Sequence, residues 1–138
     1  MSNSVDKILV TSQKGGVGKS TLAANLAGFF REVLSRRAAL VDFDRQATSS
    51  KWISGAEKTK EEHTLFQPEK GVSHGITALN ASRALREATK KNDVVVADLT
   101  WTDVLPKEFF FEFDLLLVPC SLSAIRSEEH TSELQSRL

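Results

Sequence analysis

Lysine and glycine residues are concentrated in residues 14–21, which read KGGVGKST. Glycines let a backbone wrap closely enough for its N–H groups to cradle phosphates, and a lysine that follows them can reach the β- and γ-phosphates of a nucleotide. The plain phosphate-loop pattern G-x-x-x-x-G-K-[ST] needs glycine where this chain has Gln13, and a second lysine, Lys14, stands beside it. Two lysines could therefore contact one nucleotide, and they could come from one subunit or from two.

Three aspartates stand where apolar runs end. Asp42 and Asp44 follow the run at residues 38–41, and their i, i+2 spacing places both carboxylates on one side of an extended chain. Asp98 ends a second run, at residues 94–97. Open α/β sheets bind ligands at the carboxyl ends of their strands. A carboxylate there can hold a water of Mg²⁺, because this ion keeps several waters and takes few protein ligands.

A sheet and helices must bring these groups together, and the apolar periodicity predicts both. Short apolar runs rich in β-branched residues predict buried strands. Apolar residues three and four apart after the glycines predict a helix whose amino terminus favours phosphate. Strands are expected at about 7–12, 38–42, 94–98 and 114–119, and helices at 19–35, 47–54 and 76–91. A helix or turn is expected at 103–112 and a surface excursion at 55–75. This alternation indicates an α/β fold with a parallel sheet.

The glycine-rich stretch and two further segments resemble the ParA/MinD group of deviant Walker ATPases. KGGVGKST has the form of that group's loop, residues 40–49 (LVDFDRQATS) look like its second motif, and residues 94–98 (VVVAD) look like its Walker B strand. The segments lie in the family's order, and the resemblance spans roughly residues 5–125. It implies a three-layer sheet of the P-loop NTPase type, mostly parallel and incomplete at its C-terminal side. Gln46 favours the ParA-like branch.

The resemblance assigns a role to each matching residue. Lys14 would be the signature lysine that reaches the partner's nucleotide across an ATP-sandwich dimer, and Lys19 would bind the β- and γ-phosphates. Asp44 would position or activate the attacking water, in a reaction that depends on positioning and charge neutralisation. The nucleotide-binding residues would be Gly15, Gly16, Val17, Gly18, Lys19, Ser20 and Thr21. Ser20 would bind Mg²⁺ directly, whereas Asp42 and Asp98 would bind it through water.

Two departures from the family's pattern concern hydrolysis. Arg45 stands where the family usually has proline, and no glycine follows Asp98 before Pro106, where a glycine-containing switch is usual. A backbone N–H to the γ-phosphate is therefore not predicted from this segment. The sequence supports ATP binding more strongly than turnover.

The ParA-like resemblance implies a Mg²⁺-dependent ATPase of plasmid or chromosome partitioning. ATP would promote a homodimer that binds DNA without sequence preference, and a ParB-like centromere-binding protein would stimulate hydrolysis and release. One alternative is a MinD-like membrane-associated positioning ATPase, which needs a C-terminal amphipathic helix. Another is an inactive truncated fragment. An iron–sulfur reductase with the same loop is disfavoured, because a cluster shared by two subunits needs two cysteines per chain and only Cys120 is present.

The last residues of the chain differ in character from the rest. Residues 126–136 read RSEEHTSELQS, which is the translation of a widely used sequencing-library adapter. We therefore expect residues 1–125 to be the N-terminal portion of the ATPase domain and 126–138 to be a non-native tail. Without that tail the formal net charge is about +1, so bulk charge gives no support for nucleic-acid binding.

The sequence contains no membrane segment. No stretch approaches the roughly 18 apolar residues of a transmembrane helix, and the first residues carry no signal-peptide core. We therefore expect a cytoplasmic location, associated with the nucleoid if the protein is ParA-like.

Overall fold

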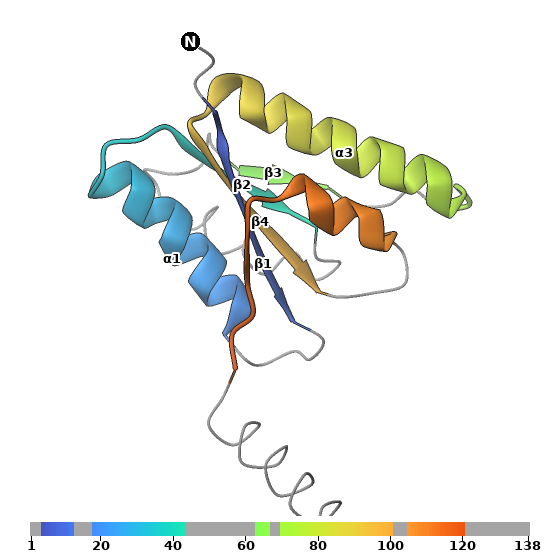
Figure 1. The fold of residues 1–138 in the computed structure, drawn as a ribbon, viewed down its shortest axis with the longest axis horizontal. Coiled ribbons are helices and arrows are strands. Elements are labelled where there is room, and N and C mark those ends of the chain that lie inside the picture. The colour runs from blue at the N-terminus through green and yellow to red at the C-terminus, as the bar shows by residue number, and fades with distance from the viewer. Residues whose placement is uncertain (1–3, 13–17, 44–62, 67–69, 101–104, 121–138) are drawn as a thin grey trace, which may run out of the picture.

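The computed structural model describes residues 4–12, 18–43, 63–66, 70–100 and 105–120 of the chain, in which strands and helices alternate (Figure 1). The elements are β1 Asp6–Ser12, α1 Lys19–Glu32, β2 Ala38–Asp42, β3 His63–Leu65, α3 His74–Lys91, β4 Val94–Thr100, the 3-10 helix η2 Lys107–Glu112, and β5 Leu115–Leu117. The helix expected at 47–54 and the tail expected at 126–138 lie outside the described residues.

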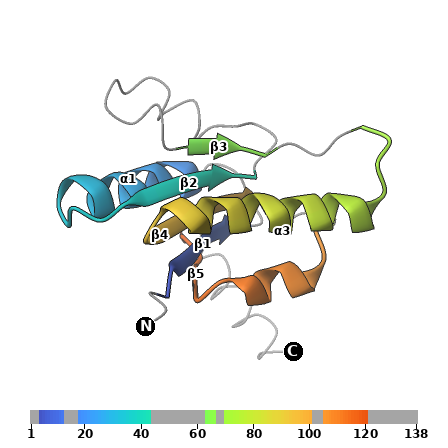
Figure 2. The same ribbon diagram turned by 90° about the horizontal axis from the view of Figure 1, so that it is seen from above.

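The five strands form one parallel sheet in the order β3-β2-β4-β1-β5 (Figure 2). β1 pairs with β4 over its whole length, from Asp6 opposite Val94 to Ser12 opposite Thr100. The chain passes from β1 to β2 across β4, and from β4 to β5 across β1, so these connections leave in opposite directions. Open α/β sheets bind ligands at such a reversal, outside the carboxyl ends of the strands.

Alternate residues of the central strands face two separate apolar clusters. The first cluster contains the buried alanines of α1 and consists of Ile8, Val10, Ala23, Ala27, Ala38, Leu40, Val94 and Val96. The second contains residues of α3 and η2 and consists of Leu9, Val41, Phe43, Ala81, Leu85, Val95, Ala97, Leu99, Leu105, Phe109 and Phe113. Helices therefore cover both faces of the sheet (Figure 1), and the predicted three-layer α/β fold is confirmed.

The sequence-based expectations were wrong for one strand and for several element ends. β3, His63–Leu65, lies inside the segment read as a surface excursion, because a strand this short leaves no periodic signal. The helix expected at 19–35 ends at Glu32, and Ser35, with a φ of 50°, lies in the connection to β2. The helix or turn expected at 103–112 is present as a 3-10 helix over Lys107–Glu112, which begins after Pro106.

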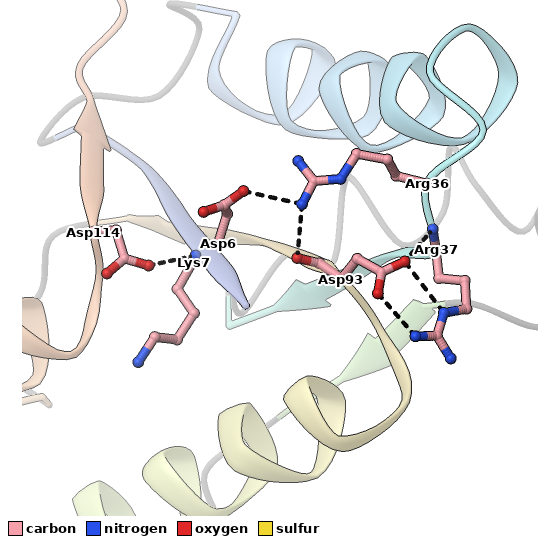
Figure 3. A network of polar contacts seen from close by, with 6 residues as sticks. All are labelled: Asp6, Lys7, Arg36, Arg37, Asp93 and Asp114. Carbon is pink, nitrogen blue, oxygen red and sulfur yellow. Dashed lines mark hydrogen bonds and ion pairs between the residues drawn. The ribbon is translucent and has the colours of Figure 1, made fainter. Parts of the chain in front are cut away.

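Charged residues tie the elements together at the amino-terminal end of the sheet (Figure 3). Arg36 Nη2 donates hydrogen bonds to Asp6 Oδ2 at 3.0 Å and to the Asp93 carbonyl oxygen at 3.3 Å. Arg37 donates to Asp93 Oδ2 from its backbone N at 3.1 Å and from Nε at 3.2 Å, and to Oδ1 from Nη2 at 2.8 Å. This forked geometry is the strong form of a guanidinium–carboxylate contact. The hydrogen bonds from Arg37 lower the pKa of Asp93, and the same contact raises the pKa of Arg37.

The Asp93 contact predicts a pH-dependent stability. A carboxyl whose pKa is lower in the folded than in the unfolded protein stabilises the fold above its unfolded pKa, and loses that effect as pH falls through the folded value. The free energy of unfolding of the wild type should therefore exceed that of Asp93→Asn at neutral pH, by a small margin because the pair is at the surface. This difference in the free energy of unfolding should decrease below about pH 4, the usual pKa of aspartate, and disappear as the pH falls through the lower pKa of Asp93 in the folded protein. Urea unfolding at several pH values measures this, and a gap that does not change with pH would contradict it.

Candidate functional site

The carboxyl ends of β1, β4 and β2 lie at one level of the sheet. Val10 lies opposite Asp98, and Asp98 in turn lies opposite Asp42. Each aspartate is two residues beyond a residue of the α1-side cluster, Leu40 or Val96, so both carboxylates are on the face covered by α1. Both aspartates are fully buried. Two carboxylates therefore stand on neighbouring strands in the layer between the sheet and α1.

Helix α1 presents its amino terminus at the same end of the sheet. Gly18, the residue before the helix, has φ 82° and ψ 13°, a left-handed conformation that favours glycine. Gly18 has no side chain that could accept a hydrogen bond from the first turn of the helix. The N-cap residue therefore does not compete with a ligand for the N–H groups of that turn. Those groups and the helix dipole favour an anion. The first turn contains the predicted binding residues Lys19, Ser20 and Thr21.

Lys19 connects this helix end with the carboxylates. Lys19, Ala23 and Ala27 are four residues apart and are the buried residues of α1, so the lysine faces the sheet. Its Nζ donates to Asp98 Oδ1 and forms an ion pair between residues 79 apart in sequence. The exposed fractions of the two side chains are 6% and 0%. Removal of Lys19 would leave the buried Asp98 carboxylate without this cation, which is costly.

The second carboxylate oxygen of Asp98, Oδ2, shows whether the residues present fit the predicted Mg²⁺ ion. Asp98 Oδ2 is buried and has no hydrogen-bond partner within the described part of the chain. Such an atom is costly unless something satisfies it, and a water of a bound Mg²⁺ ion could do so. The described residues contain no group of three or more His, Cys, Asp or Glu side chains that could hold a metal. Mg²⁺ binds through one or two carboxylates plus phosphates and water, so the residues present fit the water-mediated role.

The structure thus assembles one part of the predicted site at a single end of the sheet, namely Gly18, Lys19, Ser20, Thr21, Asp42 and Asp98. The other part lies outside the described residues and stays a prediction, namely Lys14, Gly15, Gly16, Val17 and Asp44.

Phe43 supports the site and was not among the predicted residues. Its backbone N donates to the carbonyl oxygen of Asp98 at 2.8 Å, which fixes the end of β2 against β4. Its buried ring lies 5.4 Å from the ring of Phe66 and 5.3 Å from that of Phe109, between centroids. Aromatic pairs at these distances stabilise a core beyond the area that they bury. The signal available in the sequence was an apolar residue between the two aspartates of the second motif, pointing to the opposite face.

A protein-family model matches most of the chain. The model described as "CobQ/CobB/MinD/ParA nucleotide binding domain" matches residues 8–136. The match includes every described residue of the site.

Curated proteins with different assigned roles are similar over nearly the whole chain. "Cytosolic Fe-S cluster assembly factor NUBP1 homolog" of Caenorhabditis elegans is 31% identical over 94% of this chain and 42% of its own length. "Chromosome-partitioning ATPase Soj" of Thermus thermophilus is 29% identical over 91% of this chain and 52% of its own length. "Virulence plasmid ParA family protein pGP5-D" of Chlamydia muridarum is 26% identical over 97% and 46%. The chain spans about half the length of these relatives.

None of the helices in the described ranges is both long and apolar enough to cross a bilayer.

Proposed function

This chain belongs to the CobQ/CobB/MinD/ParA nucleotide-binding family, and from that premise we propose that it acts as a partition ATPase. The protein binds ATP with Mg²⁺, forms an ATP-dependent homodimer, and hydrolyses ATP during plasmid or chromosome segregation. Similarity to a chromosome-partitioning ATPase and to a plasmid ParA family protein supports this assignment.

The observation that carries the proposal is the contact of Lys19 with Asp98, beside Asp42, at the start of α1. Lys19 would contact the β- and γ-phosphates, and the N–H groups of the first turn would receive phosphate oxygens. Ser20 would hold Mg²⁺ directly, and Asp42 and Asp98 would hold it through water. The ion, when bound, neutralises charge on the phosphates during transfer.

Two residues outside the described ranges complete the proposed chemistry. Asp44 orients the attacking water, and Lys14 contacts the nucleotide of the partner subunit in the ATP-bound dimer. Both roles follow from the match of the sequence to the family's motifs.

The proposed partners are DNA, bound without sequence preference, and a ParB-like centromere-binding protein. The formal net charge of the chain is zero, so contact with DNA must come from a local basic patch rather than from bulk charge. The proposed location is the cytoplasm, with the ATP-bound dimer on the nucleoid.

The test measures the mass of the protein and its retention of a random-sequence DNA duplex in the presence of ATP–Mg²⁺, ADP–Mg²⁺ or no nucleotide. We expect dimers and salt-sensitive DNA binding with ATP alone. ATP binding without DNA binding at low salt would contradict the partition role. Sedimentation with anionic lipid vesicles in place of DNA would favour a membrane-associated positioning ATPase instead.

A second candidate is iron–sulfur cluster assembly, favoured by the 31% identity with the nematode assembly factor. The 138 residues contain one cysteine, Cys120, which is exposed, whereas a cluster is held by several thiolates. Anaerobic incubation with iron and sulfide, followed by absorbance spectroscopy, separates the candidates. The partition proposal expects no cluster absorbance in wild type beyond that of a Cys120→Ser control, and a stable cluster in wild type alone would favour assembly.

A further inference from the structure

We propose that the outer face of α3 is a docking surface for an acidic amphipathic helix of a partner protein. The surface, called here the α3 stripe, consists of Ile76, Leu79, Arg83, Arg86 and Lys90, all of which are exposed. Helix α3 packs on the opposite face of the sheet from α1. The inference therefore goes beyond the proposed function and concerns a part of the molecule that does not take part in the nucleotide site.

The α3 stripe follows one side of the helix. Its members are alternately three and four residues apart, which is the spacing that places side chains along one line of a helix. The buried residues of α3, namely Thr77, Ala81 and Leu85, lie on the opposite side of the helix, toward the sheet. From residue 76 to residue 90 the stripe is about 21 Å long, which is enough for a partner helix to follow over several turns.

The amino-terminal part of the stripe is apolar. Ile76 and Leu79 expose 53% and 57% of their surface, and they lie on successive turns of the helix. A single exposed apolar residue is ordinary, but apolar residues repeated along one face are the contacts through which helices recognise each other. A matching partner therefore carries apolar side chains on two successive turns.

The carboxyl-terminal part of the stripe is positively charged. Residues 83–91 contain four cations and one carboxylate, and that carboxylate, Glu87, accepts from Lys90 at 2.7 Å. The hydrogen bond and charge of Lys90, followed by the charges of Lys91 and Arg83, lower the pKa of Glu87. Arg83 and Arg86 form no ion pair with any residue that the structure describes. Their guanidinium groups suit carboxylates of a partner, which they can bind through two parallel hydrogen bonds.

A second copy of α3 does not match the stripe. If two copies crossed antiparallel with their stripes aligned, the Arg83 side chains would oppose each other, and the apolar part of each copy would face the basic part of the other. In a parallel pair, each cation would lie beside its own counterpart. Opposed like charges disfavour association, so the occupant must differ in charge from this chain.

The order of the side chains favours a helix over a nucleic acid or a lipid surface. DNA would engage the cations through its phosphates and leave Ile76 and Leu79 without a partner. A helix that lies on a membrane buries a broad apolar face with basic residues on its polar face, whereas here apolar and basic residues follow each other along one line. A partner helix that is apolar at one end and acidic at the other matches both parts at once.

The test measures the binding of two synthetic helical peptides to the full chain without nucleotide, by fluorescence anisotropy. Both peptides carry two leucines at one end in the spacing of the stripe, and the remaining positions of that line are glutamate in one peptide and lysine in the other. The wild type should bind the glutamate peptide about tenfold or more tightly than the lysine peptide. Arg83→Glu/Arg86→Glu should reverse this preference, which an unfolded variant could not do. Lys107→Glu, which changes an exposed cation on η2, is the control and should leave the preference unchanged.

The apolar part of the stripe has its own variant. Ile76→Ser/Leu79→Ser should bind the glutamate peptide about tenfold more weakly than the wild type and still prefer it to the lysine peptide. Unchanged affinity would show that only charge attracts the peptide, and the proposed docking of a helix would be overturned.

A random-sequence DNA duplex and vesicles of anionic lipid are measured with the same proteins. If the wild type does not bind the glutamate peptide, or binds both peptides equally, the inference is overturned. Binding of the duplex or the vesicles that Arg83→Glu/Arg86→Glu abolishes would, in that case, assign the stripe to nucleic acid or to a membrane instead. None of these measurements requires ATP, so their outcome is independent of the proposed function.

Discussion

Replacement of Lys19 with alanine should abolish detectable ATP binding. The lysine is the buried cation at the start of α1, and no other described side chain is placed to neutralise the β- and γ-phosphates from that helix. Loss of one partner from a buried charge contact costs about 2–5 kcal/mol, which corresponds to roughly 30-fold to several-thousand-fold in affinity. Calorimetry with ATP and Mg²⁺ measures the change, and tight binding by the variant would overturn the assignment of residues 14–21 as a phosphate loop.

The variant needs controls for folding, because it leaves Asp98 buried without its cation. Removal of one partner from a buried pair destabilises a protein by about 3–5 kcal/mol. The double variant Lys19→Ala/Asp98→Asn removes both charges and should recover much of that stability without recovering ATP binding. Lys90→Ala is the matched surface control, since Lys90 pairs only with the exposed Glu87 in the described part of the chain. It should leave ATP affinity unchanged.

Replacement of Asp44 with alanine should stop ATP turnover while ATP-dependent dimers still form. Asp44 is the proposed group that positions the attacking water, and a general base or water-positioning side chain typically contributes 10²–10⁴-fold to a rate. The phosphate contacts of Lys19 and the first turn of α1 do not involve Asp44, so nucleotide binding should persist.

Phosphate release and molecular mass, measured on the same preparation, test this separation of roles. Glu87→Ala, which removes an exposed carboxylate on α3, serves as the control and should hydrolyse ATP at the wild-type rate. Unchanged hydrolysis by Asp44→Ala would assign the catalytic role to another residue. Loss of dimers together with turnover would show that Asp44 contributes to assembly.

The central part of the fold could be predicted from sequence because its strands carry strong local signals. β1, β2 and β4 are apolar runs buried on both faces, and the predicted strands at 7–12, 38–42 and 94–98 overlap all three. The expectation that parallel strands end at one edge of the sheet was right for Asp42 and Asp98, which lie on neighbouring strands in register. The i, i+2 placement of Asp42 and Asp44 stays a prediction, because Asp44 lies outside the described residues. β3 was not predicted because three residues are too few for a recognisable alternation of apolar and polar side chains. Its strand conformation depends on its pairing with β2.

The contact between Lys19 and Asp98 could not be predicted, although both residues were named from sequence. The two residues are 79 positions apart, and only the strand order places the end of β4 under the start of α1. The family's motifs suggested that each side chain contacts the nucleotide or its metal. They did not suggest that the two side chains contact each other. Phe43 was missed for a related reason, because its role depends on Phe66 and Phe109, which the fold brings from distant segments.

The position of β4 between β1 and β2 also has a consequence for synthesis on the ribosome. β1 and β2 are not neighbours in the sheet, so neither can find its main partner until β4 has been made. From Asp42 at the end of β2 to Thr100 at the end of β4 the ribosome must add 58 residues, which takes about 3–12 s at 5–20 residues per second. Throughout that interval β1 and β2 lack the strand that lies between them in the sheet, and only β2 can pair, with the short β3. We therefore expect the nascent chain to be exposed to aggregation, or to capture by a chaperone, until β4 emerges and joins them.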